Sequence, residues 1–249
     1  MRYFFEIAYN GTNYHGWQRQ KNASSVQQVV EEALHLLLRK QITITGSGRT
    51  DTGVHCQQQY FHLDLEKPVK TRELQYRLNS FLPKDITIKS IVRVQEDAHA
   101  RFSAVLRSYE YRITVKKDPF LQDLSYYYPN PLDVEAMNEA AGLLIGKHDF
   151  EAFSKVRTDV NNFVCEITEA QWVPESDLLI FRITANRFLR GMVRAITGTL
   201  LNVGKGKWEV CQVRAVIDSL DRKKAGAAAP AHGLFLTEVK YPEGIFLKE

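Results

Sequence analysis

Apolar and polar residues alternate almost without a break between residues 107 and 115, and this run constrains the fold more than any other feature of the chain. A period of two residues is typical of a half-buried β-strand. The residues expected on one side are Tyr109, Tyr111, Ile113 and Val115, and those on the other are Ser108, Glu110, Arg112 and Thr114. We therefore expect a sheet that packs other elements against one of its faces.

Strand-like and helix-like segments alternate on both sides of this run. Strands are predicted near residues 2–9, 42–45, 57–64, 86–94, 165–173, 178–185 and 234–241. Helices are predicted near residues 26–37, 71–80, 133–144, 187–203 and 208–220, with Ser25 and Gln28 forming a capping-box pattern before the first. The order predicts an α+β fold of antiparallel and mixed sheets flanked by helices.

The length of 249 residues suits two modest units better than one large core. We predict an N-terminal α/β half at residues 1–105 and a C-terminal α/β half at residues 106–249. The composition, with 44% hydrophobic and 25% charged residues, is that of a folded soluble protein and excludes disordered, collagen-like and coiled-coil chains.

No signal-peptide pattern begins the chain, and no apolar stretch reaches the ~18 residues that a membrane span needs. The three cysteines lie far apart and outside any CxxC spacing, which argues against a disulfide framework or a zinc finger. We expect a protein of the reducing cytoplasm.

The net charge of +4 is too small to identify a nucleic-acid binder, but its distribution is informative. Residues 1–105 carry 14 basic and 10 acidic side chains, whereas residues 106–249 carry 19 of each. Between Leu178 and Trp208 there are six basic residues and no acid. Such a stretch suits phosphate binding, although a solvated helix face accounts for it equally well.

The segment of residues 46–55, Gly-Ser-Gly-Arg-Thr-Asp-Thr-Gly-Val-His, is the strongest candidate for chemistry. Its three glycines allow sharp turns and close approach to a ligand, but it lacks the spacing of a nucleotide-phosphate loop. Asp51 is either a turn former or a catalytic carboxylate, and the former is the commoner role for such a residue. A metal site is conceivable from four side chains without recognisable ligand spacing: Asp51, His55, His62 and Asp64.

Aromatic and basic residues supply further candidates. Tyr109 either packs in the core or stacks on a base, and its spacing favours the core. Arg187, Arg190 and Arg194 are expected on one face of the predicted helix at residues 187–203. The aromatic residues of the first loop, Tyr14, His15 and Trp17, either stack on bases or pin that loop to the body.

Taken together, the motifs resemble those of the bacterial tRNA pseudouridine synthase A family, and the resemblance runs through nearly the whole chain. The motifs that carry it are YNGTxY at residues 9–14, GWQRQ at 16–20, SVQ at 25–27, GSGRTDTGVH at 46–55, NSFLP at 79–83, AHARFSA at 98–104, RSYEY at 107–111, GKHDF at 146–150, ANRFLRGMVR at 185–194 and GLFL at 233–236. Asn10 and Ser47 stand where the family usually has Asp and Ala.

The resemblance implies a role for individual residues. Asp51 would be the catalytic nucleophile, Arg49 would accompany the flipped-out uridine, and Arg194 would pair with Asp51 and orient it. Tyr109 would pack against the target base. Leu234 would belong to the substrate-binding residues, and we expect Arg187 and Arg190 to help bind RNA.

The resemblance also implies the pseudouridine synthase fold, with two similar halves around a central basic cleft. The reaction would isomerise uridine to pseudouridine at positions 38, 39 and 40 of the tRNA anticodon arm, by a homodimer without cofactor or metal. A carboxylate would add to the base or the ribose, or take a ribose proton. Two alternatives stay open: a non-catalytic RNA-binding module, and a metal-dependent hydrolase using Asp51 with His55 and His62.

Overall fold

The computed structural model describes residues 1–156 and 161–247, and the chain folds as two compact units. Unit 1 comprises Met1–Leu106 together with Leu236–Glu249, and unit 2 comprises Arg107–Phe235. The division expected from the sequence assigned everything after residue 105 to the second half. The C-terminal segment groups with unit 1 because β10 (Leu234–Lys240) lies beside β3 (His55–Asp64) in the sheet.

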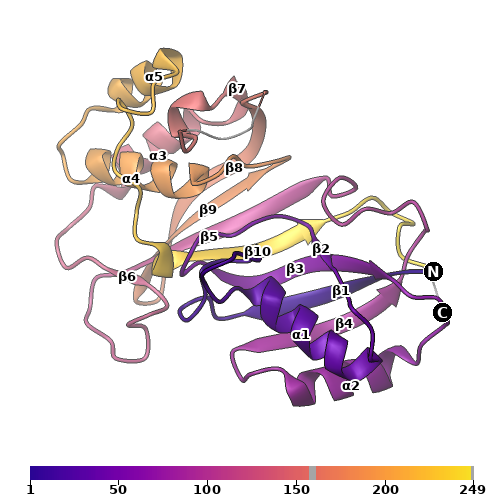
Figure 1. The fold of residues 1–249 in the computed structure, drawn as a ribbon. Helices are drawn as coiled ribbons and strands as arrows, with labels where there is room; N and C mark the ends of the chain where they lie inside the picture. The colour runs from indigo at the N-terminus through magenta and orange to yellow at the C-terminus, as the bar shows by residue number, and fades with distance from the viewer. Residues whose placement is uncertain (157–160, 248–249) are drawn as a thin grey trace. The chain divides into compact units, whose positions relative to one another are not determined.

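Unit 1 is a sheet with two helices. Its strand order is β4 (Ile86–Arg93), β1 (Arg2–Tyr9), β3 and β10, and the short β2 (Thr45–Gly46) pairs with β3. The central strand β1 is antiparallel to both β3 and β4. Helices α1 (Val26–Leu38) and α2 (Thr71–Phe81) lie side by side along these strands (Figure 1). The core of this unit contains Phe5 and Phe61, fully buried and stacked with ring centroids 4.8 Å apart.

Unit 2 repeats the combination of sheet and helices. Strands β5 (Leu106–Thr114), β9 (Leu178–Ala185), β8 (Val164–Glu175) and β7 (Gly146–Asp149) pair in this order, and β6 (Tyr126–Tyr127) runs parallel to β5. Helices α3 (Val134–Gly142), α4 (Met192–Gly204) and α5 (Val210–Ser219) pack together, with α3 against β8 (Figure 1). The predicted α+β class, with antiparallel and parallel strand pairs flanked by helices, is confirmed.

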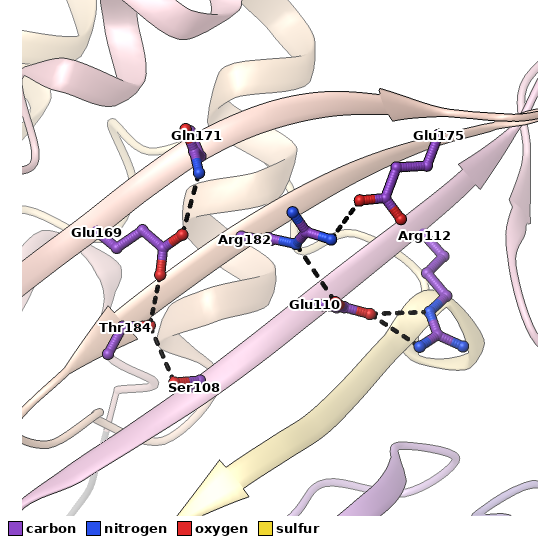
Figure 2. A network of polar contacts seen from close by, with 8 residues as sticks. All are labelled: Ser108, Glu110, Arg112, Glu169, Gln171, Glu175, Arg182 and Thr184. Atoms are coloured by element: carbon purple, nitrogen blue, oxygen red, sulfur yellow. Dashed lines mark hydrogen bonds and ion pairs between the residues drawn. The ribbon is translucent and has the colours of Figure 1, made fainter.

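The alternation first seen in the sequence gives β5 two different faces. Tyr111 and Ile113 are fully buried. On the other side, Glu110 forms ion pairs with Arg112 at 2.8 Å and with Arg182 of β9 at 3.4 Å. Figure 2 shows this network continuing across β9 and β8, with Arg182 bonded to Glu175. Two members differ from the prediction. Val115 is exposed because β5 ends at Thr114, and Thr114 is buried, with its hydroxyl donating to the Lys116 carbonyl.

The start of α1 follows half of the predicted capping box. The Ser25 hydroxyl accepts a hydrogen bond from the Gln28 backbone N–H at 3.4 Å, as expected. The Gln28 side chain instead donates to Glu32. The strand expected at residues 42–45 is reduced to Thr45 and Gly46. Ile44 stays outside the ladder because the side chains of Glu31 and Gln27 bond its backbone N–H and carbonyl.

The helix expected at residues 187–203 begins only at Met192. Gly191 adopts a left-handed conformation, with φ of 71°, and separates the helix from the preceding segment. Arg187 and Arg190 therefore precede α4. The prediction that they share one helical face with Arg194 was wrong, because a continuous helix through Gly191 is required for that spacing.

Candidate active site

The loop that carries Asp51 joins β2 to β3 in unit 1, and its first half is fastened to β3. The Ser47 backbone N–H donates to the Tyr60 carbonyl at 2.7 Å, and the Gln59 side-chain amide donates to the Gly48 carbonyl at 3.1 Å. The Tyr9 hydroxyl donates to the Gln59 side-chain oxygen at 3.0 Å and lies 2.9 Å from the Thr50 hydroxyl. A buried polar network thus holds the backbone on the N-terminal side of Asp51.

A second loop, residues 10–20, packs directly on the Asp51 loop. The backbone N–H of Trp17 donates to the Thr50 carbonyl, and the backbone N–H of Gly53 donates to the Tyr14 carbonyl. Gly16 is required here, because its φ is +80° and a Cβ would stand 2.2 Å from the Thr50 carbonyl oxygen. The loop of residues 10–20 and the Asp51 loop are therefore tightly packed against each other.

The aromatic side chains of residues 10–20 serve this packing. Trp17 is 1% exposed and Tyr14 is 6% exposed. The indole of Trp17 lies where a side chain on Gly46 would clash, at 2.4 Å. The Tyr14 hydroxyl donates to Asp85 at 2.7 Å, and burial with this carboxylate raises the pKa of Tyr14. Of the two roles left open by the sequence, Tyr14 and Trp17 pin the loop to the body.

Asp51 and Arg49 emerge from these packed loops. Asp51 is half-buried, and its carbonyl accepts the Val54 N–H at 3.1 Å, which closes a turn. Arg49 is exposed and donates from Nε to the Gln18 side-chain oxygen at 3.1 Å. Gln18 in turn donates to Gln27 of α1. The side-chain amides of Gln27 and Gln18 thus connect α1 to the exposed guanidinium of Arg49 and orient it.

Two buried histidines of unit 1, His55 and His62, accept backbone hydrogen bonds. Nδ1 of His55 accepts from the Gly11 N–H and Nδ1 of His62 from the Ala100 N–H, each at 3.1 Å. Asp64 is paired with Arg2 at 2.7 Å. Across residues 1–156 and 161–247, no three His, Cys, Asp or Glu side chains gather as a metal ion would require. The arrangement of Asp51, His55, His62 and Asp64 considered from the sequence is not such a group.

In unit 2, the side chains of Tyr109 and Arg194 are each held by a contact with a neighbouring residue. Tyr109 lies on β5 opposite Ile183, and its ring packs edge-to-face on Phe188, with centroids 5.2 Å apart and an interplanar angle of 89°. This contact fixes the ring of the half-buried tyrosine. Arg194 lies in the first turn of α4 and donates from Nε to the Ala229 carbonyl at 2.7 Å.

Residues 225–230 form a strap that positions Arg194. The Ala229 N–H returns a hydrogen bond to the Arg194 carbonyl at 2.9 Å. Gly198 of α4 admits the strap, because a Cβ there would lie 1.7 Å from the Ala227 carbonyl oxygen. Tyr111 of β5 donates its hydroxyl to the Pro230 carbonyl at 2.9 Å. The small side chains of this Ala- and Gly-rich segment were the available signal in the sequence.

The remaining candidates differ in exposure. Arg190 is exposed, Arg187 is half-buried, and Leu234 at the start of β10 is 5% exposed. The backbone carbonyl of Arg190 accepts the Lys155 N–H at 2.9 Å. Unit 1 thus carries Arg49 and Asp51, while unit 2 carries the other five predicted site residues: Tyr109, Arg187, Arg190, Arg194 and Leu234.

Comparison with known proteins identifies the family. The model of the tRNA pseudouridine synthase family matches residues 7–103 and 140–242, which include both Asp51 and Arg194. The chain belongs to the tRNA pseudouridine synthase family. Its predicted family and isomerase class are confirmed: tRNA pseudouridine synthases isomerise uridine to pseudouridine in tRNA.

Every helix in the described part of the chain is too short or too polar to span a bilayer.

Relatives named tRNA pseudouridine synthase A match along nearly their whole length. The protein of Porphyromonas gingivalis is 50% identical, over 99% of each chain. That of Bacteroides fragilis is 47% identical, over 98% of each chain. A Staphylococcus aureus protein is 38% identical, over all of this chain and 94% of its own.

Proposed function

We propose that the chain isomerises uridines 38, 39 and 40 in the anticodon arm of tRNA, with Asp51 as the nucleophile. The observation that carries the proposal is the fixed loop of residues 46–55 within a chain of this family. A half-buried carboxylate on a loop held by Tyr9, Gln59 and Trp17 suits a reaction that depends on its exact position.

The chemistry explains why a carboxylate and a fixed loop are needed. The N1–C1′ bond breaks, the uracil turns, and C5 joins C1′, while the proton on C5 moves to N1. The product is an isomer, so no co-reactant is required. The base must leave its stack at a cost of a few kcal/mol. Asp51 adds to the base or ribose, or takes a ribose proton, and it is the economical base for removing the C5 proton.

The other residues then have complementary roles. Arg194 pairs with Asp51 and orients its carboxylate toward the base. Its anchoring to Ala229 supports this role, because an arginine held at Nε has a fixed direction. Tyr109, braced by Phe188, packs against the flipped base, and Leu234 borders it. Arg49 holds either the space that the base leaves or the RNA backbone beside it.

Recognition of the RNA rests on its backbone more than on base identity. Arg187 and Arg190 bind phosphate, supported by the acid-free stretch from Leu178 to Trp208. The enzyme acts in the cytoplasm as a homodimer, by resemblance to its family.

The test is to map pseudouridine by position in an unmodified tRNA transcript after incubation with wild type and with Asp51→Asn. We expect pseudouridine at positions 38–40 with wild type and at least a 1000-fold lower rate with the variant, on the order of the loss expected for a nucleophile. Asp177→Asn is the matched control, because Asp177 is an exposed carboxylate that pairs with Lys116 at the surface. Modification at other positions would refute the proposed site, and full activity of Asp51→Asn would refute the nucleophile.

A further inference from the structure

The connection between β4 and β5, residues 94–105, presents an aromatic ring to solvent. Phe102 is 75% exposed, although large apolar side chains are ordinarily buried. The guanidinium of Arg101 lies over its ring, 5.4 Å from the centroid. The His99 ring packs against the same ring, with centroids 4.5 Å apart. Neither Phe102 nor Arg101 has a role in the chemistry proposed above.

The backbone under this ring is firmly held by the rest of unit 1. Ala98 and Ala100 are buried, at 3% and 0% exposure. The Ala98 carbonyl accepts from Arg2 at 2.9 Å, and the Ala100 carbonyl accepts from the Tyr241 hydroxyl at 2.7 Å. The exposed ring therefore stands on an ordered support.

Two imidazoles complete that support. Nδ1 of His62 accepts the Ala100 N–H, and Nδ1 of His99 accepts the N–H groups of Arg101 and Phe102, at 3.1 and 3.3 Å. Burial, with Arg2 nearby, lowers the pKa of His62 to about 4, so this ring is neutral and able to accept. Because the backbone of Arg101 and Phe102 is already fixed, this segment loses little conformational entropy when a ligand binds to it.

A preorganised ring with a cation against it matches one ligand chemistry. Nucleobases stack on exposed aromatic rings whatever their identity, and arginine both stacks on rings and contacts phosphate. The acidic residues Glu96 and Asp97 lie on the same connection. This segment is therefore not generally basic, and non-specific attraction of phosphates would not account for RNA binding to it. A nucleotide bound here would therefore be held mainly by stacking of its base on Phe102, and Arg101 would contact its phosphate.

We propose that Arg101 and Phe102 form a stacking site for an unpaired base of the tRNA substrate. The inference rests on the proposed function for the identity of the RNA. Arg101 contacts the phosphate of the nucleotide whose base lies on Phe102. The site adds affinity and register outside the residues that touch the reacting uridine.

The test replaces Phe102 with Trp, whose fluorescence is quenched when a base stacks on it. Tyr76→Trp is the matched control, because Tyr76 is on α2 of the same unit and is 76% exposed. We expect tRNA to quench the Phe102→Trp variant well beyond the parent protein, and a fully paired RNA duplex of equal length to quench it far less. Equal quenching of the Phe102→Trp and Tyr76→Trp variants would overturn the proposal.

Affinity gives a second measurement, made with Asp51→Asn as parent so that the RNA is not converted. Phe102→Ala is expected to weaken tRNA binding about 5- to 100-fold, the range for loss of one base–aromatic stack, with Phe102→Tyr close to the parent. Arg101→Gln is expected to reduce the slope of log affinity against log salt by about one. Unchanged affinity of Phe102→Ala would overturn the stacking site while leaving the proposed function standing. Absence of pseudouridine with wild type would instead refute the proposed function, and the quenching result would still report on the stacking site.

Discussion

At the scale of single residues, the Tyr9 hydroxyl connects the sheet to the Asp51 loop. It is buried between the Thr50 hydroxyl and the Gln59 side chain. Tyr9→Phe removes this connection and leaves buried polar atoms without a partner. We expect a loss of about 1–3 kcal/mol in the free energy of unfolding, measured by urea denaturation.

The same variant tests whether the network positions the nucleophile. Because the hydroxyl holds the backbone next to Asp51, we expect a lower kcat for pseudouridine formation with little change in KM. Tyr127→Phe is the control, since Tyr127 belongs to unit 2 and is 46% exposed. A Tyr9→Phe protein with wild-type kcat would mean that the Asp51 loop keeps its geometry without the hydroxyl.

At the scale of elements, local sequence patterns predicted most helices and strands but not their irregular ends. The strand at residues 178–185 was placed correctly because its period and its flanking residues agree. The start of α4 was not, because apolar spacing continues through Gly191 although the backbone does not stay helical there. The Asp51 loop was recognisable from its glycines, whereas the strap at residues 225–230 depends on contacts across 27 positions, as between Gly226 and Thr199.

The strap gives a prediction about α4. Gly198→Ala places a methyl group into the Ala227 carbonyl, and the neighbouring strap backbone must move. We expect a loss of about 1–3 kcal/mol in the free energy of unfolding, as for overpacking. We also expect a lower rate of pseudouridine formation, because Ala229 no longer holds Arg194.

Gly142→Ala is the control for this substitution. Gly142 ends α3, and apart from its chain neighbours and the backbone of its own helix, no heavy atom of the described residues lies within 4 Å of a Cβ built there. Alanine is a better helix former than glycine by up to ~1 kcal/mol, so this variant should be as stable as wild type or more so. If Gly198→Ala behaved like Gly142→Ala in thermal denaturation and in activity, the strap would not hold Arg194.

At the scale of the whole molecule, the grouping of Leu236–Glu249 with unit 1 was beyond the reach of local patterns. Sequence periodicity predicts that residues 234–241 form a strand but says nothing about its neighbour. The partner is set by long-range contacts, such as the hydrogen bond from the Val239 N–H to the Gln58 side chain. The chain therefore leaves unit 1 after residue 106 and returns to it at residue 236.

Charge, unlike strand pairing, can be followed along the chain, and it yields a prediction for tRNA binding. The surplus of four basic residues comes from residues 1–105, yet the proposed phosphate ligands Arg187 and Arg190 lie in unit 2. Each phosphate contact adds about 0.7 to 0.9 to the slope of log affinity against log salt. We expect the double variant Arg187→Gln, Arg190→Gln to lower this slope by about 1.5, measured as tRNA affinity over a salt series.

Lys116→Gln separates specific phosphate contacts from net charge. Lys116 is an exposed cation of unit 2, with its side chain 74% exposed and paired with Asp177 at 2.7 Å. Screening beyond about 10 Å at 0.1 M salt makes a distant charge contribute little, so this variant should keep the wild-type slope. If Lys116→Gln lowered the slope as much as one arginine does, net charge alone would govern binding. If the double variant kept the wild-type slope, Arg187 and Arg190 would not be phosphate ligands, and the acid-free stretch would be a solvated surface.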